Sequence, residues 1–140
     1  MHTPIALSHY ALLSLSGEQA QEFLQGMITS DLNRLSANTL QYGAFCNRKG
    51  RVLCNFHVFR HDSMLYLLLP HTMAEACLTA LQPYARFSKV TLSVETDVKL
   101  VGTLSDTAVP PTGEAICHQQ FPGSDPRCLW VLPADNSASA

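Results

Sequence analysis

Two apolar periodicities, and the order in which they alternate, most constrain what this chain can fold into. Apolar residues at positions 20, 23, 24, 27 and 28, and again from 73 to 84, recur at the 3.6-residue spacing of a buried helix face. Apolar runs of strand length occupy residues 10–16, 40–46, 51–61, 64–69, 90–94 and 98–104. The order strand, helix, three strands, helix, two strands predicts an α+β fold with a mostly antiparallel sheet and two helices.

Local signals delimit the two helices. Ser16 with Gln19, and Thr72 with Glu75, have the spacing of capping boxes and predict where each helix begins. Pro83 is expected to end or kink the second helix, because proline has no N–H to donate inside a helix.

Composition narrows the classes of function. The chain has 140 residues, the size of one domain, and its 9 Lys and Arg against 11 Asp and Glu include no basic run. Direct binding of nucleic acid is therefore not expected. No apolar run reaches the 18 or more residues of a membrane span, and residues 1–10 carry no Lys or Arg ahead of an apolar stretch, so we expect a cytoplasmic protein without a membrane partner.

The sequence lacks the common patterns of metal sites and catalytic centres. Its five cysteines are odd in number and include no C-x-x-C pair, so we expect free thiols and no metal site. It contains neither a G-x-S-x-G nucleophile turn nor a G-x-x-x-x-G-K phosphate loop. We therefore expect binding and not catalysis.

A hairpin around residues 47–50 presents two different faces. The turn predicts that Tyr42 lies opposite Asn55 and that Phe45 lies opposite Val52. Strand alternation then assigns one face to the core (Phe45, Val52, Cys54, Phe56 and Val58) and leaves a polar face open to a ligand (Tyr42, Cys46, Arg51, Asn55 and His57).

Five short motifs follow one another in a recognisable order. They are L-S-G at 15–17, F-L-Q-G at 23–26, T-S-D at 29–31, C-N-R-K-G-R at 46–51 and Y-A-R-F-S-K-V at 84–90. Together they resemble the YgfZ-type folate-binding proteins, relatives of the glycine cleavage system T protein (aminomethyltransferase), over roughly residues 11–104. The resemblance implies two similar halves that hold a folate between them, followed by a barrel-like domain.

This chain carries only the first half of that arrangement. Residues 1–105 are expected to form a folate-binding-type half-domain, 106–127 a loop rich in proline and glycine, 128–133 a last strand and 134–140 a disordered tail. The family's downstream K-G-C-[FY]-x-G-Q-E signature is absent. The chain is thus expected to be a fragment, or a stand-alone half that pairs with a complementing half-domain or forms a homodimer by exchanging residues 128–132.

The resemblance also implies a weak site for tetrahydrofolate. Asn47, Lys49 and Arg51 would present an amide and two cations to the carboxylates of a folate tail, unless they form only a solvated turn. Asp31 would shape the loop at the border of the site or act only as a local cap, and Tyr42 and Asn55 would line the site or serve only as sheet residues.

A departure from the aminomethyltransferases bears on chemistry. Where those enzymes carry paired acidic residues, this chain has Cys54 and Asn55, so it lacks the carboxylate that transfer chemistry needs. The expected role is folate binding that supports iron–sulfur protein maintenance and tRNA modification. The alternatives are a fragment of a one-carbon (aminomethyl) transferase and an interaction module with a vestigial folate site.

Overall fold

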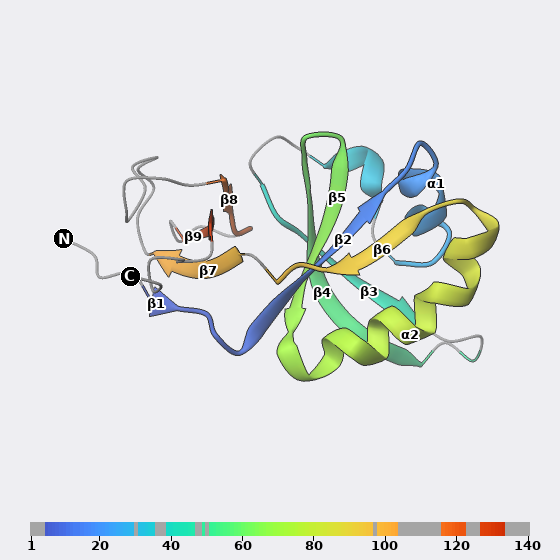
Figure 1. Cartoon of the computed structure of the whole chain (residues 1–140), viewed down its shortest axis with the longest axis horizontal. Helices are drawn as coiled ribbons and strands as arrows, with labels where there is room; N and C mark the ends of the chain where they lie inside the picture. The colour runs from blue at the N-terminus through green and yellow to red at the C-terminus, as the bar shows by residue number, and fades with distance from the viewer. Residues whose placement is uncertain are drawn as a thin grey trace.

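The computed structural model describes residues 5–29, 31–35, 39–46, 49, 51–96, 98–103, 116–122 and 127–133. Within these residues the chain forms two antiparallel sheets and two α-helices (Figure 1). This confirms the predicted α+β class with a mostly antiparallel sheet.

The larger sheet has five strands in the order β3-β4-β5-β2-β6. Its strands are β2 (Tyr10–Ser16), β3 (Gln41–Cys46), β4 (Val52–His61), β5 (Met64–Pro70) and β6 (Thr91–Val94). A two-residue turn at Asp62 and Ser63, both at positive φ, joins β4 to β5. Such a turn matches the twist of the two strands, and β4 pairs with β5 from His57 opposite Leu68 to His61 opposite Met64.

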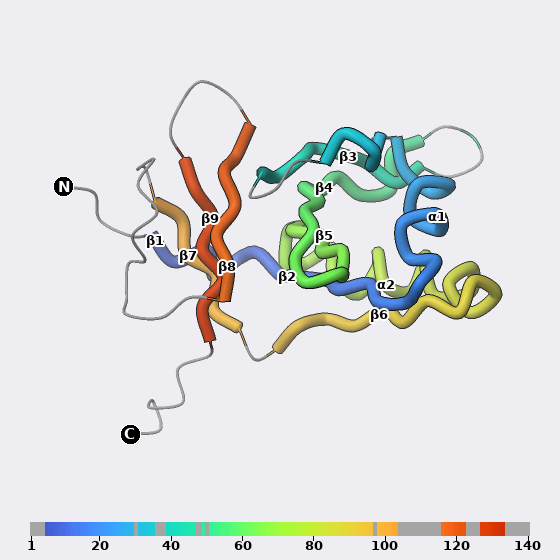
Figure 2. Tube along the Cα trace, turned by 90° about the horizontal axis from the view of Figure 1, so that it is seen from above, coloured from blue at the N-terminus to red at the C-terminus, as the bar shows by residue number. Residues whose placement is uncertain are grey.

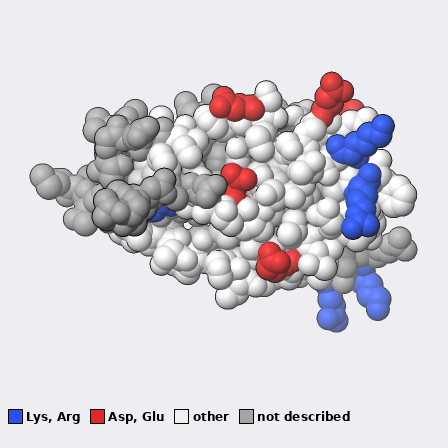
Figure 3. Space-filling model, viewed as in Figure 1, with Lys and Arg blue, Asp and Glu red and all other residues white. Residues whose placement is uncertain are grey.

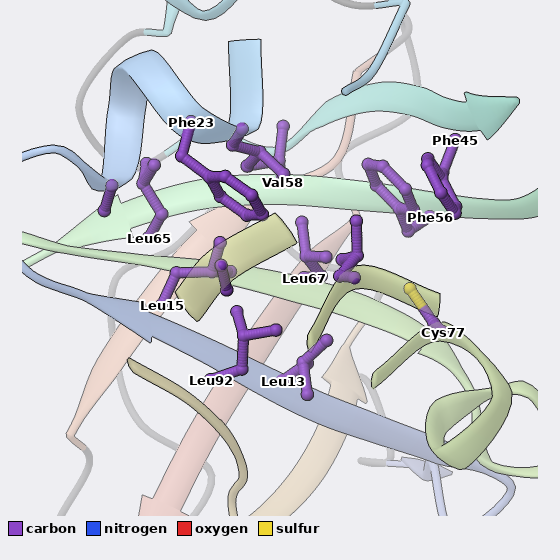
Figure 4. Packing of buried hydrophobic residues seen from close by; sticks show 14 of the residues in the cluster. Leu13, Leu15, Phe23, Phe45, Phe56, Val58, Leu65, Leu67, Cys77 and Leu92 are labelled. Atoms are coloured by element: carbon purple, nitrogen blue, oxygen red, sulfur yellow. The ribbon is translucent and has the colours of Figure 1, made fainter. Parts of the chain in front are cut away.

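Both helices, α1 (Ala20–Gln25) and α2 (His71–Phe87), pack on one face of this sheet through the main hydrophobic core. Alternate residues of β2, β4 and β5 point toward the helices, as Figure 4 shows for Leu13, Leu15, Phe56, Val58 and Leu67. On α2, the buried residues Ala74, Cys77, Leu81 and Ala85 form the facing stripe.

A smaller sheet covers part of the opposite face. It has the order β1 (Ile5–Ala6), β7 (Val98–Thr103), β9 (Cys128–Pro133) and β8 (Cys117–Gln120), and Figure 2 shows it as a second layer beside the larger sheet. A second core joins the layers, in which Leu12, Phe59 and Leu68 of the larger sheet meet Leu100, Leu129 and Val131 of the smaller one. The two layers are also tied by a hydrogen bond of 2.8 Å from Leu40 N to Gln120 O.

Neither predicted capping box forms. Gln19 is the N-cap of α1 and Pro70 that of α2, each without a side-chain cap hydrogen bond, because Ser16 still lies in β2 and β5 runs directly into α2. The first helix is also shorter than predicted, since Ile28 forms a bridge to Phe45. Pro83 does not end α2, which continues to Phe87; Pro83 lies on the exposed side of the helix.

The predicted hairpin exists with its strands displaced by two residues. Tyr42 lies opposite His57, Ala44 opposite Asn55, and a bulge follows Phe45. A shift of two preserves the face of each side chain, so Tyr42, Asn55 and His57 share one face as predicted. Cys46, predicted on the same face, follows the bulge and lines a groove on the helix side of the sheet. Val52, predicted to be in the core, is 55% exposed because it lies where the sheet ends.

One strand lies where the sequence predicts a loop. β8, at Cys117–Gln120, falls inside residues 106–127 and pairs with β9. Its sequence C-H-Q-Q has no apolar alternation, so only the pairing with β9 identifies it as a strand. Residues 134–140 lie outside the described part of the chain.

Candidate functional site

The smaller sheet leaves one end of the β3–β4 face uncovered. Along β4 the side chains on this face change from Phe59, fully buried between the sheets, to His57, half-buried, and then to Asn55, exposed. Tyr42, opposite His57, is 56% exposed. We call Tyr42, Asn55 and His57 the uncovered face.

Three aromatic rings run in a row from this face toward the smaller sheet. The ring of Tyr42 meets His57 edge-on with centroids 5.7 Å apart, and His57 meets Phe121 edge-on at 5.4 Å. Phe121 follows β8 directly, and the guanidinium carbon of Arg127 lies 5.6 Å from its ring centroid. The row therefore ends on a permanent cation held by a cation–π contact.

A cavity of about 380 Å³ opens beside this row. Its wall combines apolar side chains from both sheets, including Ile5 and Leu68, with the polar groups of Tyr10, His57, Thr103 and Arg127. No acidic residue is among the described residues that line it. An apolar wall with few polar groups and one cation suits a flat organic molecule that carries a negative group.

The electrostatic environment keeps the imidazole of His57 neutral. Burial, and then the positive charge of Arg127, hold the pKa of His57 below its ordinary value. A neutral imidazole offers one N–H donor and one nitrogen acceptor, and the amide of Asn55 offers both kinds of group as well. The uncovered face can therefore recognise a polar heterocycle by hydrogen bonds without adding charge.

Cys54 and Asn55, expected from the resemblance to stand in place of an acidic pair, point in opposite directions. Asn55 belongs to the uncovered face, whereas Cys54 is buried on the helix side. A hydrogen bond with Cys77 of α2 lowers the pKa of Cys54, and the same bond, with burial, raises the pKa of Cys77. Only Asn55 can meet a ligand on the uncovered face, and its amide cannot act as a carboxylate base.

Of the six site residues predicted from the sequence, the structure brings Tyr42 and Asn55 together on the uncovered face. Asp31 lies beside the start of β3, where its backbone oxygen accepts from Gln41 Nε2 at 2.8 Å. Its side chain accepts from Asn33 N at 3.0 Å and lies 4.0 Å from Arg34, which is the geometry of a local cap.

Of the two predicted cations, Lys49 lies away from the uncovered face. Lys49 lines a different groove on the helix side of the sheet, and Arg51 is exposed just before β4. Asn47 lies outside the described residues. Phe121 and Arg127, which complete the aromatic row, were missed because they sit in the segment predicted as a loop and nothing in their spacing ties them to β4.

The described residues were also compared with what a disulfide, a metal site and a membrane-spanning helix require. All five cysteines are free thiols. Among the residues that the structure describes, no three His, Cys, Asp or Glu side chains come together as a metal site would require. No described helix has the length and hydrophobicity needed to cross a membrane.

Comparison with known proteins agrees with the motif order. Residues 5–107 match the model of the GCVT N-terminal domain. The tRNA-modifying protein YgfZ of Colwellia psychrerythraea (strain 34H / ATCC BAA-681) is 33% identical over 117 residues, which cover 84% of this chain and 35% of that protein. YgfZ of Sodalis glossinidius (strain morsitans) is 29% identical over 128 residues, covering 84% and 39%. The chain thus spans little more than a third of the length of these relatives.

A solved structure shows the same fold. The glycine cleavage system aminomethyltransferase T from Bartonella henselae superimposes with a TM-score of 0.78 at 16% identity, over 99% of this chain and 44% of that one. The resemblance to YgfZ-type proteins and the T protein, inferred from the motifs, is confirmed.

Proposed function

Since the chain belongs to the family defined by the GCVT N-terminal domain, we propose that it binds a folate-type ligand, tetrahydrofolate or a close relative, on the uncovered face. The aromatic row from Tyr42 through His57 to Phe121, which ends on Arg127, is the observation that carries the proposal. Folates combine a polar heterocycle, a benzoyl ring and a carboxylate tail. The row offers neutral hydrogen-bonding groups at one end and a guanidinium at the other.

The chain acts by binding and not by transferring a one-carbon group. Asn55 presents an amide where transfer chemistry needs a carboxylate, and Cys54 points to the helix side. The relatives named tRNA-modifying proteins support a role in tRNA modification. Support of iron–sulfur protein maintenance is proposed from the motif resemblance.

Titration of the purified chain with tetrahydrofolate tests the proposal. We expect a dissociation constant weaker than about 1 μM, because the uncovered face is open on one side and its hydrogen bonds compete with water. Tyr42→Ala should weaken binding, and Lys99→Ala, an exposed change on β7, is the matched control. A tight sub-micromolar complex would contradict the open site, and the absence of saturable binding would contradict the proposal itself.

A truncated ligand separates the two ends of the row. Arg127→Ala should weaken binding of tetrahydrofolate about tenfold, since a charge-assisted hydrogen bond is lost. The same substitution should leave binding of a pterin without the benzoylglutamate tail unchanged. If Arg127→Ala affects both ligands equally, Arg127 does not bind the tail.

A further inference from the structure

A second hollow lies on the helix side of the molecule, away from the uncovered face. This groove, about 630 Å³, runs between the end of α1, the β3–β4 connection and the C-terminal half of α2. Its wall is mainly apolar and includes Met27, Phe45, Leu53, Ala80 and Tyr84, with Lys49 at its edge. We call it the helix-side groove.

The sequence of α2 shows what shape of partner would fit. Met73, Cys77, Ala80, Tyr84 and Phe87 recur at alternating steps of four and three residues, the seam spacing by which one helix packs against another. The chain itself covers only the first part of this seam, since Cys77 is 2% exposed, Tyr84 48% and Phe87 90%. The uncovered part of the seam continues past the groove to the end of the helix.

Further large apolar side chains are exposed at the neighbouring end of β4. Leu53, in the groove wall, is 42% exposed, and Val52 beside it is 55% exposed. With Tyr84 and Phe87 they account for four of the seven large hydrophobic residues that the described part exposes (Ile5, Tyr42, Val52, Leu53, Tyr84, Phe87 and Ile116). Such clustering at one end of a molecule is typical of an interaction surface.

Basic side chains lie around this surface. Lys and Arg side chains gather at the end of the molecule where α2 ends and the β3–β4 connection turns (Figures 1 and 3). Lys49 and Arg51 lie in that connection, and Arg86 and Lys89 lie at the end of α2. No acidic residue is among the described residues that line the groove. A second copy of the chain would bring another basic rim, so charge disfavours symmetric self-association here.

We propose that the helix-side groove is the docking site of an amphipathic helix of another protein, whose apolar stripe packs on Tyr84, Phe87 and Leu53 and whose flanks carry Asp and Glu. The seam spacing on α2 sets the helical form of the partner. The basic rim sets the charge of its flanks. The apolar wall favours a protein helix over RNA, because RNA needs a denser set of cations along its backbone.

Binding of synthetic peptides to the full chain, followed by fluorescence anisotropy, tests the proposal. Two labelled helical peptides of about 20 residues share one leucine stripe at i, i+3, i+4 and i+7 and differ only in acidic or basic flanks. The acidic peptide should bind about tenfold more tightly than the basic one. Equal binding of the two, or no binding of either, would overturn the proposal.

Two variants of α2 locate the contact. Phe87→Asp changes a side chain that is 90% exposed, so the fold should persist by circular dichroism while the acidic peptide loses about tenfold in affinity. Thr79→Asp adds the same charge at an exposed position off the seam and should change the affinity less than about twofold. An effect of Thr79→Asp as large as that of Phe87→Asp would overturn the assigned surface.

The rival occupants have their own readouts. The first rival is RNA, tested with single-stranded oligouridylate of about 12 nucleotides. If it binds more tightly than the acidic peptide and Phe87→Asp weakens that binding, the partner is RNA and not a helix. A dimer in sedimentation equilibrium that Phe87→Asp dissociates would replace it by a second copy. Binding of tetrahydrofolate should be unchanged in Phe87→Asp, so failure here leaves the proposed ligand site untouched.

Discussion

Gly17 shows how a motif residue acts through a distant part of the chain. It lies at φ +127°, and a Cβ built on it would come within 2.9 Å of the backbone oxygen of Lys89. Both the left-handed backbone and the close approach require glycine. The L-S-G motif is therefore explained by the packing of the chain before α1 against the segment after α2.

Substitution of Gly17 should test that packing. We expect Gly17→Ala to lower the free energy of unfolding by about 2 kcal/mol, measured by urea denaturation, because it adds backbone strain and a steric clash. Gly26→Ala is the control, since Gly26 has φ −75° and its added Cβ would meet nothing nearer than 3.6 Å. That variant should be slightly more stable, by about 0.5 kcal/mol. Equal losses in both variants would refute the strain argument.

His57 should make stability depend on pH. Its pKa is lowered in the folded chain, mainly by burial, so the unfolded chain binds the proton more readily. The neutral imidazole therefore contributes stability at pH values above the ordinary pKa of histidine. This contribution is lost as the pH falls through the lowered pKa of His57 in the folded chain. His57→Gln should therefore reduce the loss of stability on acidification below about pH 6.5 in urea titrations.

NMR titration separates the two causes of that shift. In Arg127→Ala the pKa of His57 should rise part of the way to its ordinary value, because burial remains while the neighbouring charge is removed. An unchanged pKa in that variant would show that Arg127 does not act on the imidazole.

At the scale of the elements, α2 stabilises the fold through one stripe and exposes another. Leu81 is fully buried against the sheet and Phe87 is 90% exposed on the same helix. Leu81→Ala should lower the free energy of unfolding by about 3 kcal/mol, and Phe87→Ala should change it by less than about 0.5 kcal/mol. A comparable loss in Phe87→Ala would mean that Phe87 supports the fold and is not reserved for a partner.

At the scale of the whole molecule, the predicted exchange of residues 128–132 concerns a strand that is well anchored. β9 pairs with both β7 and β8 of its own chain. Trp130 is 2% exposed and donates from Nε1 to Thr103 Oγ1 at 3.0 Å. In an exchanged homodimer, the same contacts would form between β9 of one chain and β7 and β8 of the other. The monomer, in which β9 pairs within its own chain, and the dimer would therefore have the same core.

Sedimentation equilibrium decides between the two forms. The exchange predicts a homodimer at micromolar concentration whose mass Phe87→Asp leaves unchanged, because the exchanged strand lies in the smaller sheet. A mass of one chain at every concentration would rule out the exchange.

Local periodicity was enough to locate most elements and the two faces of the hairpin. The 3.6-residue and two-residue spacings of apolar side chains depend only on neighbours along the chain, so they were readable directly. The polar face of Tyr42, Asn55 and His57 survived an error in pairing because a displacement of two residues keeps every side chain on its side.

Tertiary structure alone decided the rest. β8 has no apolar alternation, and it becomes a strand because β9 offers an edge to pair with. Phe121 and Arg127 reach His57 only because the smaller sheet packs over the larger one, which joins segments far apart in sequence. The sequence by itself thus determined the family, the fold class and the polar face, whereas the packing of the two sheets determined which cation and which ring complete the site.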